Sequence, residues 1–451
     1  MSHWRLSDWT LGLLVTLAVL AVWEGIVLNN RPETRGCGGD FPQFYIAGTI
    51  VNRGEADRLY DQPYFRHFQE SMRDDPLRSL YPPTLGLLMA PLARLPYVEA
   101  LAAWWAIQAI CILATGAIFY RTTPLPRPWR INMLVALAAL LPLWIAVGIG
   151  HLAPMLLLLL AGGLTLHKQG KQGWAGLVLS ILALKPQLAL GLLLWMLVRR
   201  DARTLLGLAA GFALQALSVA LFLGPSLWLD YLHAMPGISA ITRAYRYSPL
   251  FEQSFTGIVS NLLWAAGLTT WQVLVMKITY AVTASAAAVM LCRVVWARRL
   301  WQPALGTERL SGKSPLPFGR GAGGEGFLHS NFLPEGEETK ILAFRIASEN
   351  YEYACGVLFM MLFPPYFLVY DQTLLAVPLV MLWSSPAWRW GVALLATTTV
   401  LVANLSFTLG FSLTGFVALA TMLFLANFDF LKKRTKFHLK DKIAFKEVNL
   451  T

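Results

Sequence analysis

Long runs of apolar residues, separated by short polar connectors, dominate the pattern along the chain. A helix needs about 20 apolar residues to cross the hydrocarbon core of a bilayer. The pattern therefore predicts a series of membrane-spanning helices, and we expect an all-α polytopic membrane protein. The predicted spans are 10–29, 98–120, 131–148, 152–167, 203–224, 270–297, 351–367, 390–406 and 410–429.

Basic residues cluster in several of the connectors between these runs. Cytoplasmic loops of membrane proteins carry an excess of lysine and arginine. We therefore assign the basic connectors, together with the C-terminal basic tail, to the cytoplasm. The connector residues are Arg121, Arg127 and Arg130; Lys168 and Lys171; Arg199, Arg200 and Arg203; and Arg293, Arg298 and Arg299.

The stretch 174–198 is long enough for one span, yet basic connectors flank it on both sides. If both connectors are cytoplasmic, the chain must enter the membrane and return within these residues. Proline disfavours helical backbone in the residue before it, so the turn is predicted at Lys185-Pro186. We expect two short helices or a re-entrant hairpin, with Lys185 near the outer face and packed in protein or lining a cavity.

The same alternation of sides predicts about 12 crossings with both termini in the cytoplasm. Residues 81–96 and 253–266 are apolar but short, and we expect helices that lie at the outer interface or dip into it. The arginines of the loop 30–80 argue against placing that loop outside. We keep it outside because the other connectors agree with one another. The segments predicted outside are the loop 30–80, the Gly150-His151 turn, the loop 225–252 and Asp371.

Changes in composition divide the chain into four regions. Residues 1–302, which include the outer loop 30–80, are predicted to form the transmembrane region that carries the candidate catalytic residues. Residues 303–342 are rich in glycine and proline, which favours a flexible cytoplasmic insertion. Residues 343–430 are predicted to form the C-terminal transmembrane helices, and residues 431–451 a basic cytoplasmic tail.

The overall composition excludes several classes of protein. Apolar residues make up 56% of the chain and charged residues 14%, whereas soluble proteins carry about 25% charged residues. A soluble enzyme and a disordered chain are therefore excluded. The net charge is +12. The basic residues lie in the connectors and the C-terminal tail, as expected for attraction to anionic lipid headgroups, and no nucleic-acid motif is present. The four cysteines show no CxxC spacing, so no cysteine metal site is predicted. No cofactor is predicted, and the sequence does not decide metal dependence.

The outer loop carries the first candidate for chemistry. In Gly38-Gly39-Asp40, the aspartate stands just before a stretch with helical spacing of aromatic residues and a few residues beyond the first span. Aspartate is a favoured N-cap residue, so a helix cap is one interpretation. The alternative is a functional carboxylate at the outer membrane surface, where an anionic lipid headgroup would meet it together with a cation.

Lys185, His151 and Asp371 are predicted at the same outer face. Intramembrane ionisable residues are functional candidates by default, although Lys185 is also consistent with an interfacial lysine that extends to the headgroups. His151 fits a structural role at a helix junction as well, and Asp371 fits an ordinary loop acid. Several aromatic residues are expected in the interfacial belt, where some could stack on a sugar ring: Tyr60, Tyr81, Trp104, Trp105 and Trp264.

Motifs spread along the chain resemble a known family. They are GGDFPQFYIAG, NRGEADRLYD and YPPTLGLLMAPLARLP within residues 38–96, Gly150-His151 before an aliphatic span, Leu184-Lys185-Pro186, and Gln253-Ser254-Phe255-Thr256-Gly257. Together they resemble glycosyltransferase family 87, the polyprenyl-phosphate-mannose-dependent mannosyltransferases of the type C superfamily, over most of residues 10–300.

The resemblance implies a type C bundle of about 12 transmembrane helices with a long outer first loop. It implies that Asp40 is the catalytic base and that a mannosyl phosphopolyprenol donor binds from the bilayer. The site would lie on the outer face of the plasma (inner) membrane, and the acceptor would be a lipid or a glycan. Donor- or acceptor-binding residues are expected among Lys185, His151, Tyr81, Tyr60, Arg243, Arg246, Gln253 and Asp371.

One carboxylate is sufficient for such a transfer. Glycoside hydrolases need a second one because the leaving alcohol must be protonated, whereas a phosphate leaves as a stable anion. Asp40 would take the proton from the acceptor hydroxyl. Lys185, with Arg243 or Arg246, would stabilise the charge on the departing phosphate, and in-line attack would invert the anomeric centre.

Two other functions fit the same pattern. A transporter or flippase for lipid-linked sugars needs a lipid-facing groove and outer cations but no base, and it should show paired halves of similar hydropathy, which we do not see. An inactive relative acting as a scaffold is the other, because Pro364-Pro365-Tyr366 stands where the family has a histidine. Walker A, GxSxG, HExxH and GxGxxG motifs are absent, which disfavours a pump, a serine hydrolase and a metalloprotease.

Overall fold

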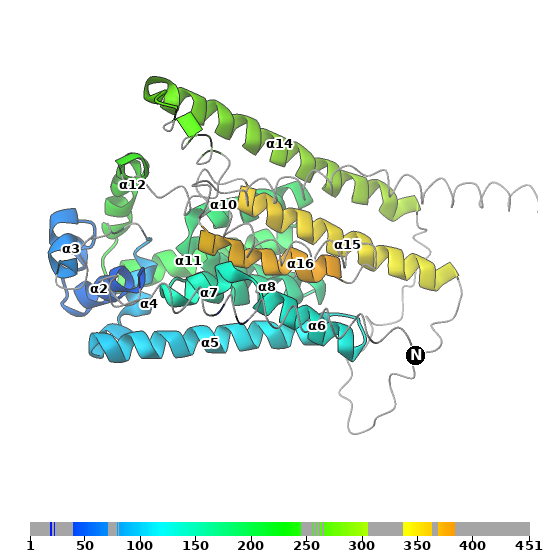
Figure 1. Ribbon diagram of the computed structural model, residues 1–451, viewed down its shortest axis with the longest axis horizontal. Coiled ribbons are helices and arrows are strands. Elements are labelled where there is room, and N and C mark those ends of the chain that lie inside the picture. The colour runs from blue at the N-terminus through cyan, green and yellow to red at the C-terminus, as the bar shows by residue number, and fades with distance from the viewer. Residues whose placement is uncertain are drawn as a thin grey trace, which may run out of the picture.

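In a computed structural model, every element of the described residues is a helix (Figure 1). The structure describes residues 39–70, 81–244, 266–304, 337–362 and 369–383, with a few single positions such as Ser79. In chain order these hold α2 (Phe41–Asn52), η3 (Ala56–Arg58), α3 (Gln62–Gln69), α4 (Thr84–Met89), η4 (Leu92–Arg94), α5 (Tyr97–Thr122), α6 (Arg127–Ala138), α7 (Leu141–Gly148), α8 (Ala153–Lys168), α9 (Gln172–Leu179), η5 (Ser180–Leu184), α10 (Pro186–Arg199), α11 (Ala202–Phe222), α12 (Leu227–Ala244), α14 (Thr269–Ala304), α15 (Glu337–Leu362), η6 (Val369–Leu375) and α16 (Ala376–Trp383), where η marks a 3-10 helix.

Three of the described helices, α5, α11 and α14, are long and apolar enough to cross a membrane. Their outer surfaces are apolar: Leu113 of α5 is 73% exposed, Phe222 of α11 76% and Val282 of α14 62%. Large exposed apolar surfaces of this kind mark contact with lipid or with a partner. These helices confirm the expectation of a membrane protein. The total of about 12 crossings stays a prediction, because the expected spans 390–406 and 410–429, and all but two positions of 10–29, lie outside the described residues.

The segment 131–148, which the pattern predicts as one span, is broken into α6 and α7. The two helices meet at 52°. Pro142 lies in the first turn of α7, and a proline removes a backbone donor and clashes with the carbonyl four residues before it. The helical hydrogen bonding therefore stops at Ala139-Leu140, and the predicted span takes the form of two bent helices that together are apolar and long enough to cross.

The predicted hairpin over 174–198 is confirmed. Lys185 has extended backbone (φ −121°, ψ 91°) between η5 and α10, and Pro186 begins the second helix. The two ends of the segment lie side by side, because Lys168 Nζ is 5.0 Å and Arg199 Cζ 5.1 Å from the centroid of the Tyr353 ring. Both basic connectors therefore lie at one end of the bundle.

The first arm of this hairpin packs against α11 through glycines. A Cβ added to Gly176 would lie 2.2 Å from the Thr204 carbonyl oxygen, and one added to Gly207 would lie 2.1 Å from the Gly173 carbonyl oxygen. Small residues let helix backbones approach closely in membranes. The glycines therefore hold the hairpin tightly in the bundle.

The short helices α2, α3 and α4 lie together at one end of the bundle, and α5 runs from there towards α6 at the other end (Figure 1). Residues 81–96 form α4 and η4, as the sequence predicts. The side chain of Asn52 donates to the carbonyl of Ala90 at 2.7 Å, and the Tyr45 hydroxyl donates to that of Leu95 at 2.9 Å. These contacts fold α2–η4 into a layer, which we call the outer layer after the side on which it is expected from the sequence.

The alternation of sides in the sequence also requires residues 372–385 to cross, which places Asp371 outside. The segment η6–α16 begins beside Lys185 and ends near Lys168, whose Nζ lies 3.9 Å from Met381 Sδ, as expected for a stretch that runs between the two faces. The insertion predicted over 303–342 lies largely outside the described residues; α14 ends at Ala304 and α15 begins at Glu337.

Candidate active site

Two glycine turns bring the start of α2 against the α7–α8 turn. Gly39 has φ +43° and Gly150 φ +65°, backbone conformations that glycine adopts without a steric cost. A Cβ added to Gly39 would lie 2.6 Å from Ile149 Cβ. This close approach lets the Asp40 N–H donate to the Ile149 carbonyl at 2.7 Å. The backbone of Asp40 is thereby fixed beside the Gly150-His151 turn.

Asp40 occupies the N-cap position of α2, but its side chain makes no capping hydrogen bond. Asp61 and Asp201 stand at the same position of α3 and α11, and each accepts a hydrogen bond from a first-turn backbone N–H, at 3.2 and 3.1 Å. An N-cap side chain bonds to the second or third helical N–H. Pro42 and Pro63 are the second residues of α2 and α3 and have no N–H, so only the third helical N–H can be capped; Asp61 accepts from it, whereas Asp40 does not. The helix-cap interpretation of Asp40 is therefore not realised.

Aromatic side chains hold α2 in place. Phe41 and Phe44 are fully buried. The Phe41 ring stacks on Trp104 of α5 with centroids 6.1 Å apart. The Phe44 ring lies 5.1 Å from Tyr81 in an edge-to-face arrangement and 6.5 Å from His151. Such pairs stabilise by roughly 0.5–1.5 kcal/mol beyond area burial, so the helix that begins at Asp40 is held on two sides.

His151 is completely buried and held as a neutral ring. Its Nδ1 accepts a hydrogen bond from the Ala153 N–H at 3.0 Å, so the ring proton lies on Nε2, which faces the Tyr81 hydroxyl at 3.4 Å. Burial, and then the nearby Lys185 ammonium, lower the pKa of His151 well below its ordinary value. The side chain of Gln108 donates to the His151 carbonyl at 2.9 Å.

Lys185 and Asp371 form a buried ion pair, with the Lys185 ammonium donating to Asp371 Oδ1. Each side chain is 5% exposed. The two residues are 186 positions apart and come from the hairpin turn and from η6. The structure therefore places Lys185 and Asp371 together, close enough to His151 for the lysine charge to lower its pKa.

Tyr60 and Tyr81 pack inside the outer layer. The Tyr60 hydroxyl donates to the Tyr81 carbonyl at 2.8 Å. Burial, with the neighbouring Tyr231 and Asp230, raises the pKa of Tyr60, so this hydroxyl stays protonated. The Gln62 amide adds a second bridge, because its Oε1 accepts from the Ser79 N–H at 3.2 Å. These bonds fix the segment that carries Tyr81.

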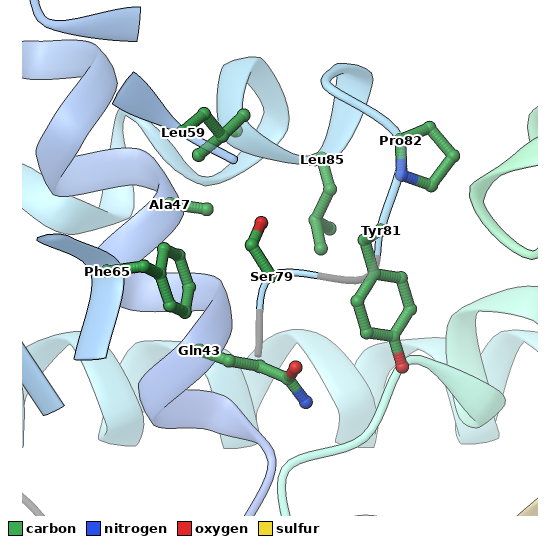
Figure 2. Close-up of a pocket in the computed structure, with 9 residues that line it drawn as sticks. Gln43, Ala47, Leu59, Phe65, Ser79, Tyr81, Pro82 and Leu85 are labelled. Atoms are coloured by element: carbon green, nitrogen blue, oxygen red, sulfur yellow. The ribbon is translucent and has the colours of Figure 1, made fainter. Parts of the chain in front are cut away.

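A small pocket, with room for about one water molecule, lies beside α2 (Figure 2). Figure 2 shows the side chains of Gln43, Ser79 and Tyr81 around it, and Gln43 stands one helical turn after Asp40. Gln43 Oε1 is buried and accepts no hydrogen bond from the described residues. The lining residues are Gln43, Ala47, Leu59, Phe65, Ser79, Tyr81, Pro82, Leu85 and Gly86.

The remaining candidates are not placed by the structure. Arg243 lies on α12, but its side chain is outside the described part, and Arg246 and Gln253 lie outside the described residues altogether. Among the described residues, no group of three His, Cys, Asp or Glu side chains could hold a metal ion.

The aromatic-belt assignment was wrong for Trp104, which is buried in the core. Trp104 is 2% exposed, and its indole donates to the Gly150 carbonyl at 2.7 Å, while that of Trp105 donates to the Val147 carbonyl at 3.0 Å. With Gln108, they secure the α7–α8 turn from α5. Sequence reasoning missed this role of Gln108, although a glutamine inside an apolar helix is itself a signal of a buried polar contact.

A second buried polar network lies at the basic end, away from Asp40. His167 bridges Asp201 and Tyr353 through its two ring nitrogens. Arg199 donates to Glu352 at 2.6 Å. Because these residues come from α8, the α10–α11 connector and α15, the network joins the C-terminal helices to the hairpin.

Apolar helices of membrane length and a buried cluster of ionisable groups beneath the outer layer define a helical membrane protein with a candidate active site. The chain belongs to glycosyltransferase family 87, which it matches over residues 80–312, more than half of its length. It is therefore a membrane glycosyltransferase. The matched region contains Tyr81, His151 and Lys185 but not Asp40 or Asp371. No curated protein and no solved structure was found to match the chain.

Proposed function

We propose that the protein transfers a hexose, most consistently mannose, from a polyprenyl-phosphate carrier to a lipid or glycan acceptor at the outer face of the plasma (inner) membrane. Asp40 is the general base. The observation that carries this proposal is the placement of Asp40 at the start of α2, directly beside the α7–α8 turn that carries His151. The backbone of Asp40 is fixed against the α7–α8 turn, while its carboxylate is not used by the helix that it begins.

The chemistry needs only one carboxylate. Asp40 removes the proton of the acceptor hydroxyl as this attacks the anomeric carbon. The bond from that carbon to the phosphate oxygen breaks, and the carrier leaves as a polyprenyl phosphate, which needs no proton from an acid. Attack opposite the leaving group inverts the anomeric centre.

Lys185 is the proposed partner of the phosphate. A buried ammonium interacts far more strongly with a developing charge than one in water does, and Lys185 is 4% exposed. Arg243, which lies on α12, and Arg246 are proposed to assist. The apolar exposed faces of α5, α11 and α14 support entry of a lipid-linked donor from the bilayer.

A donor assay tests this function. Purified full-length protein is incubated with membrane lipid extract and radiolabelled mannosyl phosphopolyprenol, glucosyl phosphopolyprenol or GDP-mannose. We expect labelled product from the mannosyl lipid, less from the glucosyl lipid and none from the nucleotide sugar. Label moved only by GDP-mannose would contradict the proposed donor. Failure of every donor in detergent, with flipping of the lipid in vesicles, would favour the transporter.

A further inference from the structure

The proposed phosphate partner is already neutralised by another group in the chain. The Lys185 ammonium is bound to the carboxylate of Asp371, and both side chains are 5% exposed. Asp371 lies on η6, a short 3-10 segment between α15 and α16. A phosphate that approaches Lys185 therefore meets an acidic group in the place it must take.

Carboxylate and phosphate oxygens compete for the same donor. Both accept charge-assisted hydrogen bonds from an ammonium, and in a buried site one lysine does not compensate two anions. Binding of the carrier phosphate to Lys185 therefore requires Asp371 to give up its contact. After transfer, the same carboxylate is available to take the lysine back.

We propose that Asp371 is an exchangeable counter-ion of Lys185, which yields to the carrier phosphate and releases the phosphate product when it returns. This inference rests on the proposed function, because it assumes that Lys185 binds the phosphate. In the resting protein the pair keeps the lysine charge compensated and in place. During the reaction Lys185 holds the phosphate, and the return of Asp371 limits how long the product stays bound.

Decyl phosphate is a suitable probe, because it carries the phosphate and an apolar chain but no sugar. Asp371→Asn keeps the size of the side chain and removes the competing charge. We expect this variant of the full-length protein to bind decyl phosphate at least about tenfold more tightly than wild type, which corresponds to about 1.4 kcal/mol. In the transfer assay, decyl phosphate should inhibit it at correspondingly lower concentration.

Two further variants serve as controls. Glu352→Gln breaks the other buried ion pair of the described C-terminal helices, that with Arg199, at the opposite end of the bundle. It should lose thermal stability without a gain in phosphate affinity. The double variant Lys185→Met/Asp371→Asn removes both charges of the first pair and should lose the gain.

Poor folding of Asp371→Asn leaves the proposal testable. The uncompensated lysine is then the expected cause, so decyl phosphate present during purification should restore yield and melting temperature of this variant but not of Glu352→Gln. Absence of rescue would contradict the proposal, as would equal or weaker phosphate binding by a folded Asp371→Asn. If the Lys185→Met/Asp371→Asn variant binds as tightly as Asp371→Asn, Lys185 is not the phosphate partner and the inference fails, while transfer by wild type would still support the proposed function.

Discussion

At the scale of single residues, the position of Asp40 depends on the absence of a Cβ at Gly39. Gly39 combines a left-handed backbone with a contact in which a Cβ would lie 2.6 Å from Ile149. Gly54 is also left-handed, with φ +74°, but has nothing within 4 Å of an added Cβ. Alanine at Gly54 would therefore add backbone strain alone, whereas alanine at Gly39 would add strain and also displace Asp40.

We expect Gly39→Ala to lower the rate of sugar transfer by about 10- to 100-fold, because small displacements of a catalytic group have effects of that size. Gly54→Ala carries similar strain, roughly 1–2 kcal/mol, and should keep transfer near the wild-type rate. Initial rates and melting temperatures of both variants provide the comparison. Equal losses of activity would show that Gly39 acts through stability alone.

Asp201 provides a prediction on pH. Burial alone would raise the pKa of Asp201, but hydrogen bonds from His167 and Thr204 outweigh it and hold the pKa at about 2. Because the folded pKa lies below the unfolded value of about 3.9, the ionised carboxylate stabilises the fold above pH 4 or so, and this contribution is lost as the pH falls towards about 2.

Asp201→Asn retains a capping oxygen for α11 and removes the charge. We expect a loss of roughly 2 kcal/mol in the free energy of unfolding at neutral pH, from the size of the pKa shift. The gap in melting temperature between wild type and variant should shrink on acidification from pH 4 downwards. A gap that is constant with pH would contradict the assigned pKa.

The sequence could identify Asp40 as a candidate and even place it at an N-cap, because Gly-Gly-Asp-Phe-Pro is a local pattern. For Lys185 and Asp371, the sequence predicts only that both lie at the same face. It does not predict their ion pair, because 186 positions separate them and tertiary packing decides which groups meet. The burial of Trp104 was missed for the same reason: an apolar helix does not reveal which side faces lipid.

At the scale of elements, apolar length is a sound guide to helices and a poor guide to their shape. It predicts α5, α8 and α11, because a helix in lipid must satisfy its own backbone hydrogen bonds. It does not predict the bend between α6 and α7, although Pro142 could have signalled it. The hairpin at Lys185-Pro186 was predictable because charge on both sides and a proline agree.

The glycine contact between α9 and α11 gives a prediction for the hairpin. Gly176→Ala places a Cβ 2.2 Å from the Thr204 carbonyl and should lower the free energy of unfolding by about 1–3 kcal/mol, the usual cost of overpacking. Gly173 lies on the same helix with nothing within 4 Å of an added Cβ. Gly173→Ala should be neutral or slightly stabilising, since alanine is the better helix former. Equal melting temperatures would contradict the packing.

At the scale of the whole molecule, the account requires the outer layer and the basic connectors to lie on opposite sides of the membrane. This arrangement can be tested with single cysteines in a variant that lacks the native cysteines. The exposed residues Asp61 of the outer layer and Arg200 of the α10–α11 connector are each replaced by cysteine. An impermeant maleimide should label Asp61→Cys in right-side-out vesicles and Arg200→Cys only in inverted ones. The reverse pattern would place the candidate site in the cytoplasm.

The most direct test of the central claim compares two aspartates at N-cap positions of the outer layer. Asp40→Asn and Asp61→Asn each keep an oxygen in place of the carboxylate, and only the first removes the proposed base. Transfer from radiolabelled mannosyl phosphopolyprenol should fall by at least about 100-fold in Asp40→Asn, the lower range for loss of general-base catalysis, and stay near wild type in Asp61→Asn. Full transfer by folded Asp40→Asn would contradict the assignment of Asp40 as the base.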